Sequence, residues 1–399
     1  MKFILLPLIL MLCFSIGSYG QIESSRMFIF GHSLIDHRPP TIPTPSNETT
    51  VPHWMYLISQ HMGKEFAAGG QYGFLPQHAN LPPISQWGYD IVPPVWESDT
   101  EPFVDANISH VLITAGNFMQ WQGPSEEYPT DPGLTPVNAT ERIVDWLGEE
   151  QDSVRIYIYE NWPDMAPYLS NGFPPSDSEF QNYNDFTQGE FHEWWVEYQD
   201  LLLSSRPNVN IRMIPVGPII AKIFNDVIPN LMSVSDMYED DAPHGRASVY
   251  CLAAIVTYMA IYESKPDVEF DPGPEVHPAI NNNMASIVEF VWSELLKFNN
   301  AQGDSRVFYD NLTNVENLEF DKKCISVYPN PVTDYINVTG NISDYNIQII
   351  DACGAVYASH LGLKHDVNLN VHSLPNGLYF IKTTHIETNS VCVQKILKQ

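Results

Sequence analysis

The sequence predicts two modules: an α/β domain built on a parallel sheet covered by helices, and a small all-β sandwich at the C-terminal end. Three observations carry this prediction. Five short apolar runs alternate with longer stretches that suit helices, a pattern typical of βαβ units. From Cys324 onward, apolar residues recur at every second position instead. Residues 323–399 hold five basic and five acidic residues, so the whole net charge of −29 falls within residues 1–322.

The five runs of the first module are short and mostly apolar, as expected of strands buried on both faces of a parallel sheet. The expected strands are Met27–Phe30, Glu65–Ala68, His110–Ala115, Val154–Tyr159 and Ile211–Val216. The expected helices are Trp54–Met62, Ala139–Gly148, Phe191–Leu203, Ala247–Tyr262 and Asn282–Phe298. Proline-rich segments after the first two strands predict long loops over the strand ends, where they would shape a site.

The N-terminal end has the pattern of a secretory signal over residues 1–20. Lys2 supplies the positive start, an apolar run follows from Phe3 to Ile16, and small residues offer a cleavage site. The alternative is a membrane anchor, for which the apolar run is short. No other segment predicts a membrane span. We expect the first domain over residues 21–300, a polar linker over 301–322 and the second domain over 323–399.

The second module predicts several short strands joined by turns, typical of a small β-sandwich. The strand-like runs are Ile325–Tyr328, Tyr335–Val338, Ile347–Ile350, Val367–Val371 and Leu378–Ile381. Cys324, Cys353 and Cys392 allow a disulfide here, but the sequence does not determine its pairing. No CxxC motif occurs, so the cysteines do not indicate a zinc site.

The acidity of the first module disfavours nucleic acids and anionic membranes as partners.

A serine, an aspartate and a histidine are the candidate catalytic residues. Ser33 follows the first strand and Gly31, at the edge of a sheet where ligands of α/β proteins bind. A serine nucleophile needs a base, and the base needs an orienting acid. Asp241 and His244 lie three residues apart in one short loop and can supply both. The alternatives are a helix cap for Ser33 and an acidic surface turn for the loop.

Donors for a negatively charged oxygen are expected at the ends of the second and third strands. Asn117 follows the third strand, and an Asn amide in such a place can stabilise an oxyanion by roughly 3 kcal/mol. Gly69, Gly70 and Gly73 follow the second strand and would let a backbone N–H approach the same point. The alternative for each is a simple turn.

These blocks together resemble the SGNH, or GDSL-type, hydrolases: Gly31-His32-Ser33-Leu34, the glycines after the second strand, Gly116-Asn117, and Asp241-x-x-His244. The resemblance covers about residues 26–264. It implies a flavodoxin-like three-layer α/β/α fold and an esterase, lipase or carbohydrate deacetylase activity. Ser33 would be the nucleophile, His244 the base and Asp241 its partner. The Ser33 N–H, the Gly73 N–H and the Asn117 side chain would form the oxyanion hole. His32 and Phe118 stand where the family usually has Asp.

The C-terminal region resembles the type IX secretion sorting domains of Bacteroidetes, over roughly residues 324–399. The matching segments are Val327-Tyr328-Pro329-Asn330-Pro331-Val332, Ile350-Asp351-x-x-Gly354, Leu374-x-x-Gly377-x-Tyr379 and Lys395-Ile396-Leu397-Lys398. The resemblance implies export through the periplasm to the cell surface or medium by the type IX machinery. The alternative is a carbohydrate-binding β-module.

We therefore expect a secreted serine esterase that needs no cofactor and no metal. Its substrate would be an ester, with O-acetyl groups of a polysaccharide as one option and a lipid or short-chain ester as another. The alternative from another class is a non-catalytic glycan-binding module. Trp162 is expected to line the pocket, and four other tryptophans (Trp87, Trp121, Trp194 and Trp195) could form a sugar platform or pack in the core. A competing metal site would use His32, Asp36 and His37 with Asp241 and His244.

Overall fold

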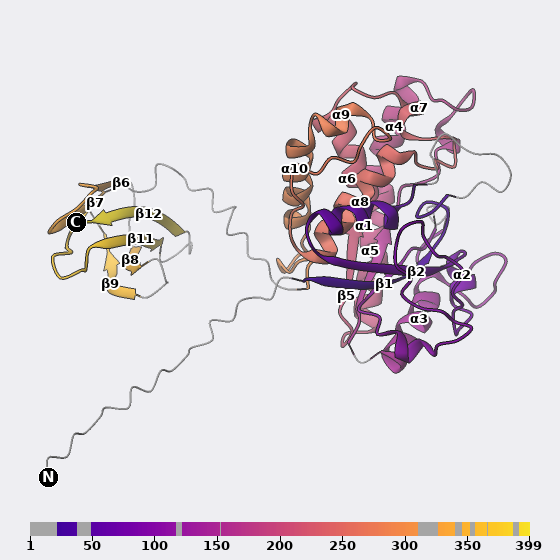
Figure 1. The fold of residues 1–399 in the computed structure, drawn as a ribbon, viewed down its shortest axis with the longest axis horizontal. Helices are drawn as coiled ribbons and strands as arrows, with labels where there is room; N and C mark the ends of the chain where they lie inside the picture. Colours follow the sequence, from indigo (N-terminus) through magenta and orange to yellow (C-terminus); the bar gives the residue numbers. More distant parts are fainter. Residues whose placement is uncertain are drawn as a thin grey trace, which may run out of the picture. The chain divides into compact units, whose positions relative to one another are not determined.

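A computed structural model of the chain describes residues 22–37, 49–116, 122–151, 153–309, 326–339, 345–351, 356–364, 366–385 and 391–399. The chain divides into two compact units, Met1–Asn311 and Leu312–Gln399 (Figure 1). The predicted signal over residues 1–20 lies outside the described residues.

The first unit is built on a five-stranded sheet, as the sequence predicts. Its strands run parallel in the order β2-β1-β3-β4-β5. They are β1 (Ser24–Gly31), β2 (Glu65–Tyr72), β3 (His110–Ile113), β4 (Arg155–Glu160) and β5 (Ile211–Pro215). In a parallel sheet all carboxyl ends lie at one edge, so the residues that follow these five strands are brought together there.

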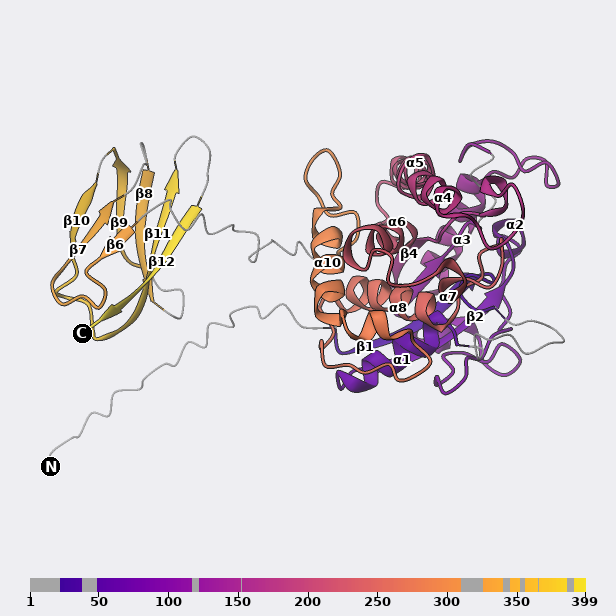
Figure 2. The ribbon, with the colours of Figure 1, turned by 90° about the horizontal axis from the view of Figure 1, so that it is seen from above.

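Helices lie over both faces of this sheet. Side chains of α3 (Pro136–Glu150) and α5 (Glu190–Ser205) share one core cluster with Phe28 and Phe30 of β1. Met27 and Ile29 are equally buried, and they point to the opposite face because side chains alternate along a strand. On that face α8 (Ala247–Tyr262) contacts α1 (Val51–His61), α6 (Val216–Lys222) and α10 (Met284–Lys297) (Figure 2).

The helix α8 coincides with the predicted range, and every one of its residues is buried. Its sequence is apolar on all sides, which is expected of a helix enclosed between a sheet and other helices rather than lying at the surface. Tyr250 near its beginning and Tyr262 at its end direct their hydroxyl groups to backbone carbonyls, at Ser33 and Glu65. The helix thus holds the ends of β1 and β2 in place.

Several elements were not predicted. The largest is α4 (Asp177–Gln188), which begins with a capping box between Ser176 and Glu179. The helix α6 begins immediately after β5 and continues into the π-helical turn η4 (Ile223–Val227). The short helices are α2 (Leu75–His78), α7 (Val234–Met237), α9 (Pro278–Asn281), η1 (Phe103–Ala106) and η3 (Ala166–Tyr168).

The linker predicted over 301–322 starts too early. Val307 and Phe308 are buried in the first unit. Arg306 forms an ion pair with Asp200 at 2.8 Å, and the Tyr309 hydroxyl donates to the backbone carbonyl of Ile156 at 2.9 Å. Residues up to 309 therefore complete the first domain, because their side chains fill gaps that its strands and helices leave. Residues 310–325 lie outside the described part.

The second unit is antiparallel and all-β, as predicted. One sheet has the order β10-β7-β6 and the other β12-β11-β8-β9. A single buried cluster contains side chains of both sheets, among them Ile336, Ile347 and Ile381. The strands are β6 (Ser326–Tyr328), β7 (Tyr335–Thr339), β8 (Tyr345–Asp351), β9 (Val356–Leu363), β10 (Val367–Asn370), β11 (Gly377–His385) and β12 (Val391–Lys398). The strands β9 and β12 were not predicted. Cys324 and Cys353 lie outside the described residues, as does the side chain of Cys392.

Candidate active site

Ser33 lies in a tight turn directly after β1. The backbone N–H groups of Ile35 and Asp36 both donate to the carbonyl of His32, at 2.9 and 3.4 Å, which closes the turn. Gly31 permits the close packing of this turn, since a Cβ there would meet Ile29 at 3.0 Å and other side chains within 3.3 Å. The carbonyl of Ser33 accepts a hydrogen bond from the Tyr250 hydroxyl at 3.1 Å. The end of β1 and the Tyr250 side chain of α8 thus fix the position of the turn.

His244 is carried by a short hairpin between α7 and α8. Tyr238 pairs with Gly245 across it, and the N–H of Glu239 donates to the carbonyl of His244 at 2.9 Å. Trp162 is 1% exposed and donates its indole N–H to the carbonyl of Pro243 at 2.8 Å. The expectation that Trp162 lines the pocket is therefore wrong: the ring lies beneath the hairpin and supports it.

Hydrogen bonds connect Ser33, His244 and Asp240 in a chain. The Nε2 atom of His244 lies 2.9 Å from the Ser33 Oγ atom. Its Nδ1 atom lies 2.7 Å from Oδ2 of Asp240, and its backbone N–H donates to the other carboxylate oxygen at 3.1 Å. When Nδ1 carries the proton and donates it to the carboxylate, Nε2 is left as an acceptor for the serine hydroxyl. Both Ser33 and His244 are half-buried.

The acid beside His244 is Asp240, and the sequence-based choice of Asp241 is not what the structure shows. The backbone carbonyl of Asp241 accepts the N–H groups of Met165 and Ala166, at 3.0 and 3.2 Å. Its carboxylate contributes, after burial, to raising the pKa of Asp164. Both oxygens of the Asp240 carboxylate bind His244, so Asp240 fills the position that was assigned to Asp241.

The hydrogen bonds to Asp240 stabilise its charged form. Burial alone would raise the pKa of this carboxyl, but the two hydrogen bonds from His244 and the nearby imidazoles outweigh it, and the pKa lies below its ordinary value. Asp240 is therefore ionised at neutral pH. An ionised acceptor on Nδ1 favours the tautomer that leaves Nε2 free to accept a proton.

A second histidine lies against the first. The rings of His37 and His244 are stacked, with centroids 3.7 Å apart and 18° between their planes. The Nε2 atom of His37 lies 3.5 Å from Oε2 of Glu239. Two successive acids, Glu239 and Asp240, thus each lie beside one of two stacked imidazoles. The metal-site alternative grouped His37 with His244, but nothing in the sequence indicates that their rings stack.

The predicted metal-ligand set is not assembled as expected. His32 is 1% exposed; its Nδ1 accepts the N–H of Leu34 at 3.3 Å and its Nε2 lies 3.4 Å from the Thr114 hydroxyl, so both nitrogens face inward. In the described residues, the group with metal-ligand spacing is instead His37, Asp240 and His244, whose ligand atoms all lie within 4.8 Å of one another. Two of these three belong to the hydrogen-bonded chain on Ser33.

The predicted oxyanion donors have different positions. The N–H of Gly73 donates to the carbonyl of Gly31 at 2.9 Å, because β2 pairs with β1 as far as Tyr72, four residues beyond the predicted strand end at Ala68. The N–H of Gly73 is therefore not available to bind an oxyanion. Among the described residues, none accepts a hydrogen bond from the N–H of Ser33. Asn117 lies outside the described residues.

Comparison with known proteins identifies the C-terminal region. Residues 326–399 match the family described as the secretion system C-terminal sorting domain. No curated protein matches the chain.

Solved structures with partial similarity include PorZ of Porphyromonas gingivalis, described as an essential bacterial surface component of the type IX secretion system. It is 14% identical, and the match covers 23% of this chain and 13% of the PorZ chain with a TM-score of 0.18. A DUF3244 family protein from Bacteroides vulgatus with an immunoglobulin-like β-sandwich fold is 17% identical over 20% of this chain and 88% of its own, with a TM-score of 0.18. An endo-β-1,4-mannanase from Thermotoga petrophila is 10% identical over 74% and 92%, with a TM-score of 0.16.

In the parts of the chain that the structure describes, no helix has both the length and the apolar character needed to cross a bilayer. The match to the sorting domain indicates where the protein goes, because such a domain interacts with the secretion machinery. Residues 326–399 belong to the type IX secretion sorting domains, and the protein is secreted to the cell surface or beyond it.

Proposed function

We propose that the first domain is a serine esterase that works through an acyl-enzyme and needs no cofactor. The observation that carries this proposal is the chain of hydrogen bonds from Ser33 through His244 to Asp240, with lengths of 2.9 and 2.7 Å. Three residues from two distant parts of the sequence meet in the order that an activated serine requires. A serine that only capped a helix would not need a histidine on its hydroxyl.

The first half of the reaction forms the acyl-enzyme. As the Ser33 Oγ atom attacks the ester carbonyl carbon, its proton moves to Nε2 of His244, and Asp240 stabilises the resulting imidazolium. The carbonyl oxygen becomes negative. The N–H of Ser33 is one donor to it, and the amide of Asn117 is the second that we propose. The tetrahedral intermediate collapses when the alcohol leaves with the proton from Nε2.

The second half releases the acid. Water gives a proton to Nε2 of His244 and its oxygen attacks the acyl carbon, and the Ser33 oxygen then leaves with that proton. The enzyme returns to its starting state, and one ester and one water have become an alcohol and an acid. Each step uses only donors and acceptors of the protein.

The strand order supports the narrower fold and family proposals. An all-parallel sheet in the order β2-β1-β3-β4-β5 is the order of flavodoxin-like folds, the fold that the resemblance to SGNH hydrolases implies. In such sheets the site lies outside the carboxyl ends of the strands, next to β1 and β3, which is where Ser33 and Gly116 follow their strands. We propose O-acetyl groups of a polysaccharide as the substrate, with lipid or short-chain esters as the alternative.

The decisive experiment is hydrolysis of a panel of p-nitrophenyl esters and acetylated polysaccharides by the full chain and by Ser33→Ala. The variant is expected to lose activity and to lose labelling by a fluorophosphonate, with an unchanged melting temperature. Ser178→Ala is the matched control, because Ser178 is exposed and lies on α4, away from the site. Full activity in Ser33→Ala would disprove the serine mechanism. A wild-type chain that hydrolyses nothing in the panel would favour a non-catalytic module.

A further inference from the structure

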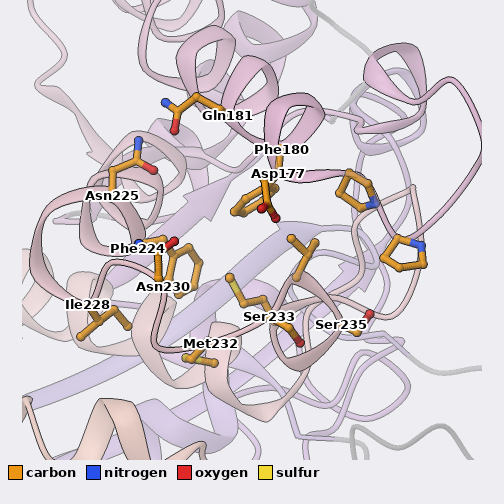
Figure 3. Close-up of a pocket in the computed structure, with 14 residues that line it drawn as sticks. Asp177, Phe180, Gln181, Phe224, Asn225, Ile228, Asn230, Met232, Ser233 and Ser235 are labelled. Carbon is orange, nitrogen blue, oxygen red and sulfur yellow. The ribbon is translucent and has the colours of Figure 1, made fainter.

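A cavity of about 330 Å³ opens between α4 and the segment that runs from Phe224 to Met237 (Figure 3). Its lining is mixed: the side chains of Phe180, Phe224 and Ile228 lie beside several polar ones. Phe224 and Ile228 are buried, so this surface is fixed by the packing of the domain. Phe180 is half-buried and comes from the opposite wall, on α4. None of the three residues that form the hydrogen-bonded chain on Ser33 lines this cavity.

The cavity lies at the same edge of the sheet as Ser33. One wall belongs to the chain that follows β4, and the other to the chain that follows β5. Ser33 follows β1, and three strand spacings of about 4.8 Å, roughly 14 Å in all, separate β1 from β5. The cavity wall is also joined to the catalytic hairpin: the carbonyl of Met237 accepts the N–H of Arg246 at 2.8 Å, and that of Ser235 accepts its Nε–H at 2.6 Å.

Polar groups that are free to bind a ligand line the rim. Asp177, Asn230 and Ser235 line the cavity, and within the described part of the chain their side chains make no hydrogen bond to the protein. Asn225 accepts a hydrogen bond from Asn184 with its oxygen, which leaves its own NH₂ group available. Figure 3 shows the side chains from α4 facing those of the 224–235 segment across an open centre. A carboxylate, amides and a hydroxyl can bind several ligand hydroxyl groups at once.

The charge of the cavity selects against anions. No Lys, Arg or His lines it, and Asp177 is acidic. The first 322 residues carry the whole net charge of −29, so a negatively charged ligand would be repelled. Aromatic side chains beside convergent polar groups are common in small-molecule sites, and this cavity has both. Here that lining suits a ligand with an apolar face and many uncharged hydroxyl groups.

We infer that this cavity binds an uncharged sugar unit of a polysaccharide, at a site separate from the reacting ester. The apolar face of the sugar ring would lie on Phe180 and Phe224, and its hydroxyl groups would contact Asp177, Asn230 and Ser235. The site would hold the chain of an acetylated polymer while the acetyl group is at Ser33. This last role rests on the proposed esterase function, whereas sugar binding by the cavity does not.

The test uses the full-length Ser33→Ala chain, which cannot consume a substrate. Titration calorimetry with neutral hexaoses of cellulose, xylan and mannan is compared with titration by oligogalacturonate, which is anionic. We expect binding of a neutral hexaose and weaker or no binding of the anionic one. Phe180→Ala and Asn230→Gly should each weaken binding at least tenfold. Glycine suits position 230 because its φ is 59°. Asn171→Ala is the matched control, exposed and outside the cavity.

The same variants in the active chain separate the two proposals. Phe180→Ala and Asn230→Gly should leave the hydrolysis of p-nitrophenyl acetate unchanged and raise KM for an acetylated neutral oligosaccharide. If the wild type hydrolyses p-nitrophenyl acetate but no neutral hexaose binds, or binding is equal in all variants, the sugar site is disproved and the esterase stands. If a hexaose binds and the variants weaken it, but no ester is hydrolysed, the sugar site stands and the esterase fails.

Discussion

The imidazole of His37 lies flat against that of His244, with the two ring centroids 3.7 Å apart. His37 covers one face of the ring whose Nε2 atom lies on the Ser33 hydroxyl. Its own Nε2 faces Glu239, the residue before Asp240. The contact therefore restricts how far the His244 ring can turn. It also places a second titratable imidazole beside His244, which must accept the proton of Ser33.

The first prediction follows from this stacking. His37→Ala should lower kcat for ester hydrolysis by roughly tenfold to a hundredfold, because His244 loses the surface that orients it. KM should change little. His37→Phe keeps a flat ring at the same place and should retain most of the activity. Equal losses in the two variants would show that the orientation of His244 does not depend on the stacked ring.

The same pair should affect the pH profile. Burial and the neighbouring His244 lower the pKa of His37 below its ordinary value of 6.5, although Glu239 and Asp240 oppose them. His37 is therefore neutral at pH 7. At lower pH it becomes charged and disfavours the imidazolium that His244 must form in the reaction. The acid limb of kcat against pH should be steeper in the wild type than in His37→Phe, and identical slopes would contradict this coupling.

The second prediction separates the two neighbouring aspartates. Asp240→Asn should lower kcat by up to about 10⁴, since the amide cannot hold His244 in the required tautomer. Asp241→Asn should lower it by less than tenfold, because Nδ1 of His244 is bonded to Asp240. The two variants differ from the wild type by the same chemical change, so each is the control for the other. A large loss in Asp241→Asn alone would restore the sequence-based assignment.

Much of the first domain could be predicted because its strands are buried on both faces. Runs such as Phe28 to Phe30 and Ile156 to Tyr159 are buried and apolar at every position. Such continuous short runs are typical of strands in a parallel sheet that helices cover on both faces. The helix α4 was missed because its sequence is polar, and its few buried residues include Asn184 and Thr187. Its position depends on contacts with α5 and α6 that local sequence does not reveal.

The candidate site was predictable in its residue types and not in its details. Ser33 stands out because it follows a buried strand, and His244 because it lies just before the apolar run of α8. The choice between Asp240 and Asp241 depends on the register of the hairpin that pairs Tyr238 with Gly245. Because Glu239, Asp240 and Asp241 are all acidic, the sequence does not show which of them faces His244. The prediction for Gly73 was wrong because β2 runs four residues beyond the predicted end at Ala68, so the N–H of Gly73 bonds to the carbonyl of Gly31 instead.

The third prediction concerns metal ions. Activity of the full chain should survive dialysis against EDTA, because every proposed step uses groups of the protein. His37, Asp240 and His244 nevertheless have the spacing of a metal site, so the outcome is informative either way. Loss of activity that Zn²⁺ restores would replace the serine mechanism with a metal-dependent one. Fluorophosphonate labelling of Ser33 in the EDTA-treated protein serves as the control for an intact site.

The last prediction concerns stability and is independent of catalysis. Burial, together with His78 and His244, lowers the pKa of His32 from 6.5 to about 3. His32 thus stays neutral in the folded protein at pH values where it is protonated in the unfolded chain. Between pH 6.5 and about 3 the unfolded state binds more proton at this residue, so the contribution of His32 to the free energy of unfolding falls as the pH falls. This one group can contribute at most about 1.4 kcal/mol per pH unit.

His32→Asn removes this titration and keeps an acceptor for the N–H of Leu34. It should be less stable than the wild type at pH 7, and the difference should shrink as the pH is lowered to 5. Unfolding by urea is followed by tryptophan fluorescence, which reports the first domain alone because all nine tryptophans precede residue 293. His360→Asn, at an exposed position of the second unit, is the control. Because the titration of His32 is what the substitution removes, parallel pH dependences in the wild type and His32→Asn would mean that this histidine is not buried in its neutral form.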